Sequence, residues 1–222
     1  MYKQILTIGY IKFLVVAMDE LNYLINYLAN KDSVREEILK LSREITRDCA
    51  MLIRKIHKSD DKDEFKDKLN EISEKIKKLN SLATFPEFVG YLSTPQQEFV
   101  EALSLYMIKF DNKIPSFKEL DFIKEENYIL GLADVIGELR REVLEAMKND
   151  NLAEVERYFK FMEDLYEFLM NFDYYHVVDN LRRKQDISRG ILEKTHGDIV
   201  TFIQNLKLRE HLKRVQIGLS QE

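Results

Sequence analysis

The sequence predicts a single all-α domain, and three observations support this class. The first is composition: of 222 residues, 45% are apolar and 33% charged, whereas only seven are glycine and three proline. So little turn material does not suit a β-sheet protein. The second is the spacing of apolar residues, which recur at threes and fours, the period of an amphipathic helix. The third is that no tandem repeat and no Gly/Ser-rich linker divides the chain.

Residues 1–17 are interpreted as an N-terminal extension outside the main domain. The run ILTIGYIKFLVVAM over 5–18 is the most apolar stretch, but it is too short to span a bilayer and Lys12 interrupts it. The preceding charge and the cleavage-site residues are weak for a signal peptide. An ordinary packed helix, or a true start at Met18, fits the pattern better. We expect a cytoplasmic protein without a membrane anchor.

The first two helices of the domain follow from their apolar stripes. Residues 18–58 contain no glycine or proline, and their stripe runs from Leu21 to Ile56. This pattern predicts one long helix or two nearly continuous ones. Ser59-Asp60-Asp61 breaks it, and a lysine-rich helix with apolar residues from Phe65 onward is then expected over 65–82.

Four more helices are expected in the rest of the chain. Thr94, Pro95 and Gln97 form a typical helix start, with Thr94 as N-cap and Gln97 closing a capping box. The helical domain should end at residue 207, which leaves 208–222 as a C-terminal tail. The helix before the last carries more aromatic and aliphatic surface than one side of a bundle needs, so we expect subunits to associate through it. The four expected helices span 95–110, 121–148, 151–171 and 177–207.

Cysteine content and net charge exclude some functional classes. With a single cysteine, Cys49, the chain can form no internal disulfide and has no zinc-type ligand spacing. The four histidines fall in no ligand pattern, and we interpret them and Cys49 as structural or surface residues. The net charge of −5 does not indicate a nucleic-acid-binding molecule as a whole, although a local basic surface is compatible with it.

Two pairs of acidic residues are the candidates for chemistry. Glu98 and Glu101 lie on adjacent turns of one expected helix, and Asp134 and Glu138 lie likewise on the next. Gly137 would let a substrate or another backbone approach the second pair closely. Oxygen-only clusters suit hard cations such as Mg²⁺, which activate water in phosphodiester or pyrophosphate cleavage. The alternative is a solvated helix face, because acidic pairs at this spacing also arise by chance.

Basic residues near these acids are candidates for binding phosphates. Arg141 shares a helix face with the second acidic pair, and its alternative role is an ion pair within its own helix. Arg182, Arg183 and Lys184 follow one another at the start of the last expected helix. They would form an ordinary solvated face unless they line a cavity, where a basic strip would hold phosphates.

Four segments of the chain carry a family resemblance. ENYILGLADVIGELRREVLEAMKNDNLAEVERYFKFMEDLYEFLMNFD and NLRRKQDISRGILEKTHGDI, at 126–173 and 180–199, resemble the C-terminal half of the translin family. QEFVEALSLYMIKF, at 97–110, is similar to the QEYVEA segment of the family, and VREEILKLSREITRDCAMLIRKIHKSD to its long first helix. The resemblance covers 18–207, and GLADVIGELRR is its most specific part.

The resemblance implies a bundle of about seven helices that assembles into a closed barrel, commonly an octamer, with single-stranded RNA inside. Family members that carry the acidic residues bind Mg²⁺ and cleave RNA, whereas members that lack them only bind. Matched position by position, the catalytic metal ligands are Glu98, Glu101 and Asp134, with Glu138 as a supporting ligand. The one departure in this segment is Phe99, where the family often has tyrosine, and it removes no ligand.

Three functional hypotheses follow. The first is an endoribonuclease that acts on single-stranded RNA with Mg²⁺ or Mn²⁺, contacts RNA through its basic residues and works as a homo-oligomer. The second is a non-catalytic ring that binds single-stranded RNA or DNA, which the complete set of acids disfavours. The third, suggested by paired carboxylates on two helices, is an all-α nucleotide pyrophosphatase.

Overall fold

The computed structural model describes the backbone of residues 2–219 and the side chains of residues 18–216. These residues form six α-helices and three short 3₁₀-helices, without any strand, which confirms the predicted all-α class. The α-helices number six, where about seven were implied, and the segment Pro86–Leu92 forms a 3₁₀-helix. In chain order the elements are α1 (Tyr2–Ile56), η1 (Lys62–Phe65), α2 (Lys66–Leu82), η2 (Pro86–Leu92), α3 (Ser93–Asp111), η3 (Phe117–Glu119), α4 (Glu125–Lys148), α5 (Leu152–Met170) and α6 (Leu181–Leu219).

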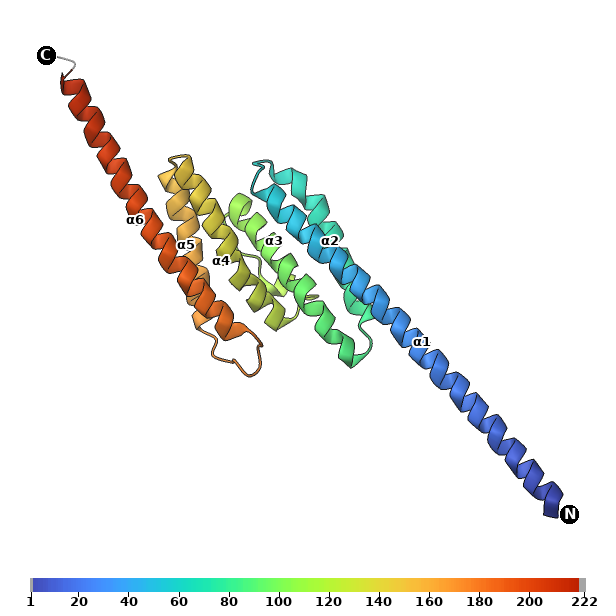
Figure 1. The fold of residues 1–222 in the computed structure, drawn as a ribbon. Helices are drawn as coiled ribbons and strands as arrows, with labels where there is room; N and C mark the ends of the chain where they lie inside the picture. Colours follow the sequence, from blue (N-terminus) through green and yellow to red (C-terminus); the bar gives the residue numbers. More distant parts are fainter. Residues whose placement is uncertain (1, 220–222) are drawn as a thin grey trace.

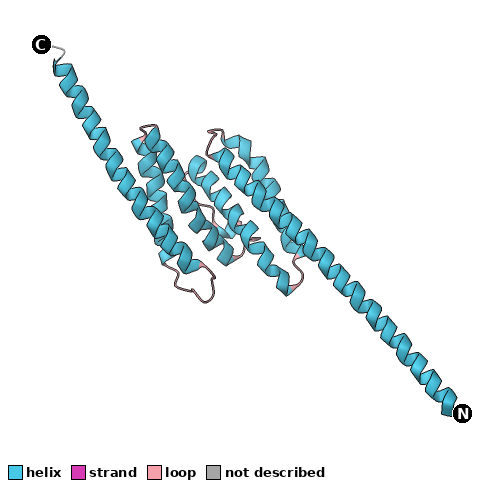
Figure 2. Ribbon diagram, in the orientation of Figure 1, coloured by secondary structure: helices cyan, strands magenta, loops and turns pink. Residues whose placement is uncertain are grey.

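The helices form a bundle with α3 and α4 in its middle. The helix α4 packs against α3, α5 and α6, and α3 packs in turn against α1. The helix α2 packs against α1 and, less extensively, against α3. Short loops join the helices, and the N-terminal half of α1 and the C-terminal half of α6 extend beyond the bundle in opposite directions (Figures 1 and 2). The middle position makes α3 and α4 the most enclosed helices of the bundle.

Long apolar stripes become core only where a helix lies in the bundle. In α1, Ile38 and Ile45 are fully buried, whereas Leu21 and Leu24, nearer the N-terminus of the same helix, are about half exposed. The expected boundaries at residues 17 and 207 do not interrupt the backbone, since α1 and α6 continue through both. Among the described residues, no helix combines the length and apolarity needed to cross a membrane. Residues 220–222 of the expected tail lie outside the described residues.

The start of α3 differs from the expectation. The helix begins at Ser93 and follows η2 directly, so Thr94 is not its N-cap, and Gln97 donates a hydrogen bond to Ser93 Oγ at 2.7 Å. The neighbouring Gln96 is buried and its Oε1 accepts from Lys124 N and from Asn127 Nδ2. Gln96 therefore joins the first turn of α3 to the first turn of α4, whereas the bond from Gln97 to Ser93 lies within α3.

The start of α6 is also later than expected, at Leu181 where the pattern suggested 177. The preceding residue, Asn180, has a φ of 63°, which lies in the left-handed region and cannot continue an α-helix backward. Asparagine tolerates this conformation better than most residues. The connection from α5 to α6 is thereby a loop, and the first turns of α6 bring Lys184 against α4.

Candidate active site

Four acidic side chains make up the candidate active site: Glu98 and Glu101 on α3, and Asp134 and Glu138 on α4. The two predicted pairs come together. Burial, followed by the charges of Asp134, Glu98 and Glu138, raises the pKa of Glu101 to about 8. Burial and then Asp134 also raise the pKa of Glu98. Such shifts arise when like charges share a poorly solvated region.

A glycine lets the two helices approach closely enough to bring the acids together. A Cβ placed on Gly131 would lie 2.7 Å from the main-chain oxygen of Gln97 and 2.7 Å from Val100 Cβ. No real Cβ packs that tightly, so this position of α4 requires glycine. Gly137, expected to permit a close approach, has only Ile191 Cδ1 near its Cβ position, at 4.0 Å. Within the described chain the close backbone contact is therefore at Gly131.

A lysine of α6 is bonded to Asp134. Lys184 Nζ lies 2.5 Å from Asp134 Oδ2, and it also donates to Gln97 Oε1 and to the main-chain oxygen of Leu130, both at 3.0 Å. Because an ammonium has three donors, all of them have an acceptor here. The sequence suggested Lys184 as an RNA-binding residue, and the structure places it within the acidic site.

A histidine that the sequence did not single out is bonded to two acids of α4. His57, which follows the last residue of α1, contacts Glu138 through Nε2 and Glu142 through Nδ1. Burial alone would lower the pKa of His57, but the hydrogen bonds to both carboxylates outweigh it and raise the pKa. Glu142 also lies 3.7 Å from Lys109 Nζ. Nothing in the local sequence pattern around His57 indicates this role, because its partners come from a distant helix.

The charges of the site are unevenly compensated. Asp134 and Glu138 each have a cation of the chain beside them, whereas Glu98 and Glu101 form no hydrogen bond or ion pair with the side chains described. Carboxylate oxygens suit Mg²⁺, so the donor chemistry fits such an ion. In this conformation, however, no three His, Cys, Asp or Glu side chains of the described residues converge closely enough to hold a metal. Asp134, the third expected ligand, is bonded to Lys184 instead.

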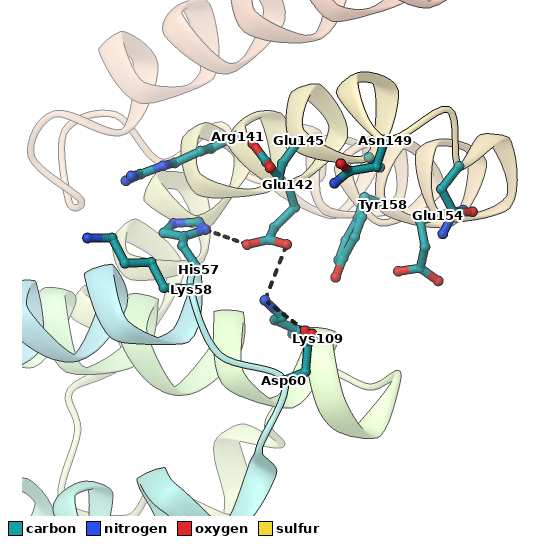
Figure 3. Close-up of a pocket in the computed structure, with 12 residues that line it drawn as sticks. His57, Lys58, Asp60, Lys109, Arg141, Glu142, Glu145, Asn149, Glu154 and Tyr158 are labelled. Atoms are coloured by element: carbon teal, nitrogen blue, oxygen red, sulfur yellow. Dashed lines mark hydrogen bonds and ion pairs between the residues drawn. The ribbon is translucent and has the colours of Figure 1, made fainter.

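A cavity of about 630 Å³ lies beyond Glu142, toward the C-terminal end of α4 (Figure 3). His57 and Glu142 form part of its wall, with Lys109, Tyr158 and Arg141 around it. Arg141 is exposed and forms no close ion pair within the described residues, although its charge helps to lower the pKa of Glu138 and of Glu145 on the same helix, after their hydrogen bonds to His57 and Lys148. An unpaired, exposed guanidinium next to the acids is compatible with phosphate binding.

A second cavity, of about 640 Å³, adjoins the acids from the α6 side. Asp134 and Lys184 line it together with Arg183, which is exposed and forms no ion pair within the described residues. Arg182 lies elsewhere, with its guanidinium 5.7 Å from the ring centre of Tyr175. Arg183 and Lys184 therefore line one cavity, whereas Arg182 is not among its lining residues.

Comparison with known proteins identifies the family. The model of the Translin family matches residues 33–197, which is most of the chain. The chain belongs to the Translin family. A relative in Schizosaccharomyces pombe, the Translin-associated protein X homolog, is 26% identical over 206 residues, covering 85% of this chain and 87% of that protein.

Solved structures of similar fold agree with this assignment. AfC3PO in a complex with duplex RNA has a TM-score of 0.76 and 28% identity, over 84% of this chain and 97% of the other. Apo-NeC3PO has a TM-score of 0.75 and 25% identity, over 82% and 96%. The matched portion of the Translin-family fold includes α3 and α4, and so the four acids.

Proposed function

We propose that this Translin-family chain binds RNA and cleaves its phosphodiester bonds in a reaction that depends on Mg²⁺ or Mn²⁺. The observation that carries the proposal is the group of four carboxylates between α3 and α4, of which Glu98 and Glu101 have no partner among the described residues. Uncompensated, partly buried like charges are costly unless a cation answers them. The RNA complex of AfC3PO supports RNA as the polymer that is bound.

In this proposal Glu98, Glu101 and Asp134 hold the metal, and Glu138 supports them. When bound, such an ion supplies positive charge that stabilises the transition state of phosphodiester cleavage. The chain's own residues prepare the site: Gly131 keeps α3 against α4, and His57 holds the Glu138 carboxylate in one orientation. Arg141 and Arg183, one at each neighbouring cavity, bind phosphates on either side of the acids.

The assembly in the proposal is a closed homo-oligomer, with the octamer as the expected form, located in the cytoplasm. Large apolar side chains are exposed on the outer helices, including Phe168 and Met170 on α5 and Val200 on α6, at 40–44%. Apolar surface of this kind marks interaction sites when it is contiguous. Enclosure of the RNA would favour single strands, and cleavage would depend on strandedness more than on sequence, because no motif here supplies base-edge contacts.

The experiment is a cleavage assay with labelled RNA oligonucleotides, with Mg²⁺ or with EDTA. The wild type should cut single strands only with metal, and Glu101→Gln and Asp134→Asn should abolish cutting while RNA binding persists. Each change keeps the shape of the side chain and removes one negative charge. The control is Glu74→Gln on α2, an exposed acid that pairs with Lys77 and lines neither cavity beside the four acids, which should cut at the wild-type rate.

Other outcomes favour other functions. RNA binding without cutting at any metal concentration would support the non-catalytic ring, which binds single-stranded RNA or DNA. Release of pyrophosphate from nucleoside triphosphates, without RNA cleavage, would support the pyrophosphatase. If blunt duplex RNA is cut as fast as a single strand, the proposed preference for enclosed single-stranded RNA is wrong. Cleavage of duplex RNA must be measured because AfC3PO was solved in a complex with duplex RNA.

A further inference from the structure

Lys184 reaches the acidic site from another helix and is held there at all three of its donors. Its acceptors are one carboxylate, one side-chain amide oxygen and one main-chain oxygen, from Asp134, Gln97 and Leu130. Two of these three groups belong to α4 and one to α3. The ammonium thus lies at the α3–α4 contact, and its side chain is only 18% exposed.

The charge of Lys184 acts on the two acids of α3 as well as on Asp134. Its ammonium lowers the pKa of Glu98 and of Glu101, against burial and the repulsion of the other acids, which raise both. Lys184 is therefore a monovalent cation that the chain itself supplies to a group of carboxylates. A divalent ion placed among the same acids would be repelled by this ammonium and would need the Asp134 oxygen to which it is bonded.

We propose that Lys184 is a positioning residue that serves as a built-in substitute for the metal: it holds Asp134 when no divalent ion is bound and must leave Asp134 when one binds. This inference rests on the proposed function, because it concerns the same acids. It gives Asp134 a cationic partner when no metal is bound. It also means that metal affinity is set by a competition between the divalent ion and Lys184.

A cavity next to Asp134 can accept the ammonium of Lys184 when a metal ion displaces it. Asp134 and Lys184 both line the cavity of about 640 Å³ on the α6 side, which also carries Arg183. A lysine side chain has four rotatable bonds, so it can turn from Asp134 into this cavity without moving α6. There it would add to the positive charge of Arg183, next to the place proposed for RNA phosphates.

The test is direct measurement of Mn²⁺ binding to the full-length protein at pH 8.5, by electron paramagnetic resonance of the free ion. At this pH Glu101, whose pKa is raised to about 8 by burial and the neighbouring acids, is mostly ionised. Lys184→Met keeps the length of the side chain without its charge, and Lys184→Gln is a second variant with a polar end. Both should bind Mn²⁺ at least fivefold more tightly than the wild type.

The control is Arg183→Gln, which removes the same charge one residue away, from a side chain that does not contact Asp134. It should change Mn²⁺ affinity less than twofold. A second readout is thermal unfolding: Mn²⁺ should raise the Tm of Lys184→Met more than that of the wild type, because tighter binding stabilises the folded state more. A merely structural lysine would lower the Tm of the variant and leave the shift by Mn²⁺ unchanged.

The outcomes separate this inference from the proposed function. If the wild type and Lys184→Met bind Mn²⁺ equally well, or the variant binds more weakly, Lys184 does not compete with the metal, and the function stands. If the wild type binds only weakly and the variants bind well, the competition is supported. If none of the proteins binds Mn²⁺ at millimolar concentration, the inference and the metal-dependent function both fall.

Discussion

Replacing Gly131 by alanine tests the close packing of α3 on α4 that brings the acids together. The added Cβ would meet the main-chain oxygen of Gln97 and the Cβ of Val100, both at 2.7 Å. Neither neighbour is a flexible side-chain end, because one is backbone and the other is the branched carbon of a helical valine. The two helices would have to separate to relieve the contact.

The magnitude follows from two opposed contributions. Overpacking of this kind costs about 3 kcal/mol, the upper end of the usual range, because the neighbours cannot move cheaply. The higher helix propensity of alanine than of glycine stabilises the folded state by about 1 kcal/mol. The net loss in the free energy of unfolding of Gly131→Ala should therefore be about 2 kcal/mol. For a chain of this size that corresponds to a fall in Tm of roughly 4–8 °C.

Gly137→Ala is the matched control on the same helix. Its Cβ would find only Ile191 Cδ1, at an ordinary 4.0 Å, so only the gain in helix propensity remains. This variant should be more stable than the wild type by about 1 kcal/mol.

Urea unfolding followed by circular dichroism, at one fixed protein concentration, gives both values. Because Gln97 and Val100 flank Glu98 on α3, Gly131→Ala should also reduce RNA cleavage. A Gly131→Ala protein as stable as the wild type would refute the argument from packing. So would equal destabilisation by the two alanines.

Three further predictions concern stability and assembly. His57→Gln should lose about 3 kcal/mol of stability in urea, because two partly buried carboxylates lose their shared partner, whereas the exposed His211→Gln should lose less than about 0.5 kcal/mol. Burial alone would raise the pKa of Asp48, but hydrogen bonds from Lys75 and Lys68 outweigh it and lower the pKa. Asp48→Asn should therefore be less stable at pH 7 by about 1 kcal/mol, measured by urea unfolding. The difference should disappear as the pH falls through that lowered pKa. Light scattering should give the mass of several subunits, associated through α5.

Each of these predictions has a result that contradicts it. If His57→Gln is as stable as the wild type, its bonds to the acids of α4 contribute nothing. A difference between Asp48→Asn and the wild type that persists below the lowered pKa would mean that the charge of Asp48 is not its cause, since both side chains are then neutral. A monomer at micromolar concentration would exclude the expected assembly.

The sequence alone determined the helical class, the approximate place of each helix and the acidic candidates. Helix formation depends on local spacing, so the stripe from Leu21 to Ile56 was enough to predict α1 from residue 18 onward. The four acids could be singled out because the spacing within each pair is also local. The resemblance to the Translin family then indicated that the pair on α3 and the pair on α4 belong to one site.

Only the tertiary structure decided which basic side chain is bonded to which acidic side chain. Lys184 is 50 residues from Asp134, and His57 is 81 residues from Glu138. Such distances in sequence leave no periodic pattern, and a lone histidine or a lysine in a basic run is compatible with many environments. Glycine is unfavourable inside a helix, and the reason for Gly131 in α4 became apparent only with α3 packed against it. Packing between helices depends on contacts between side chains that are distant in the chain, and local sequence patterns do not predict those contacts.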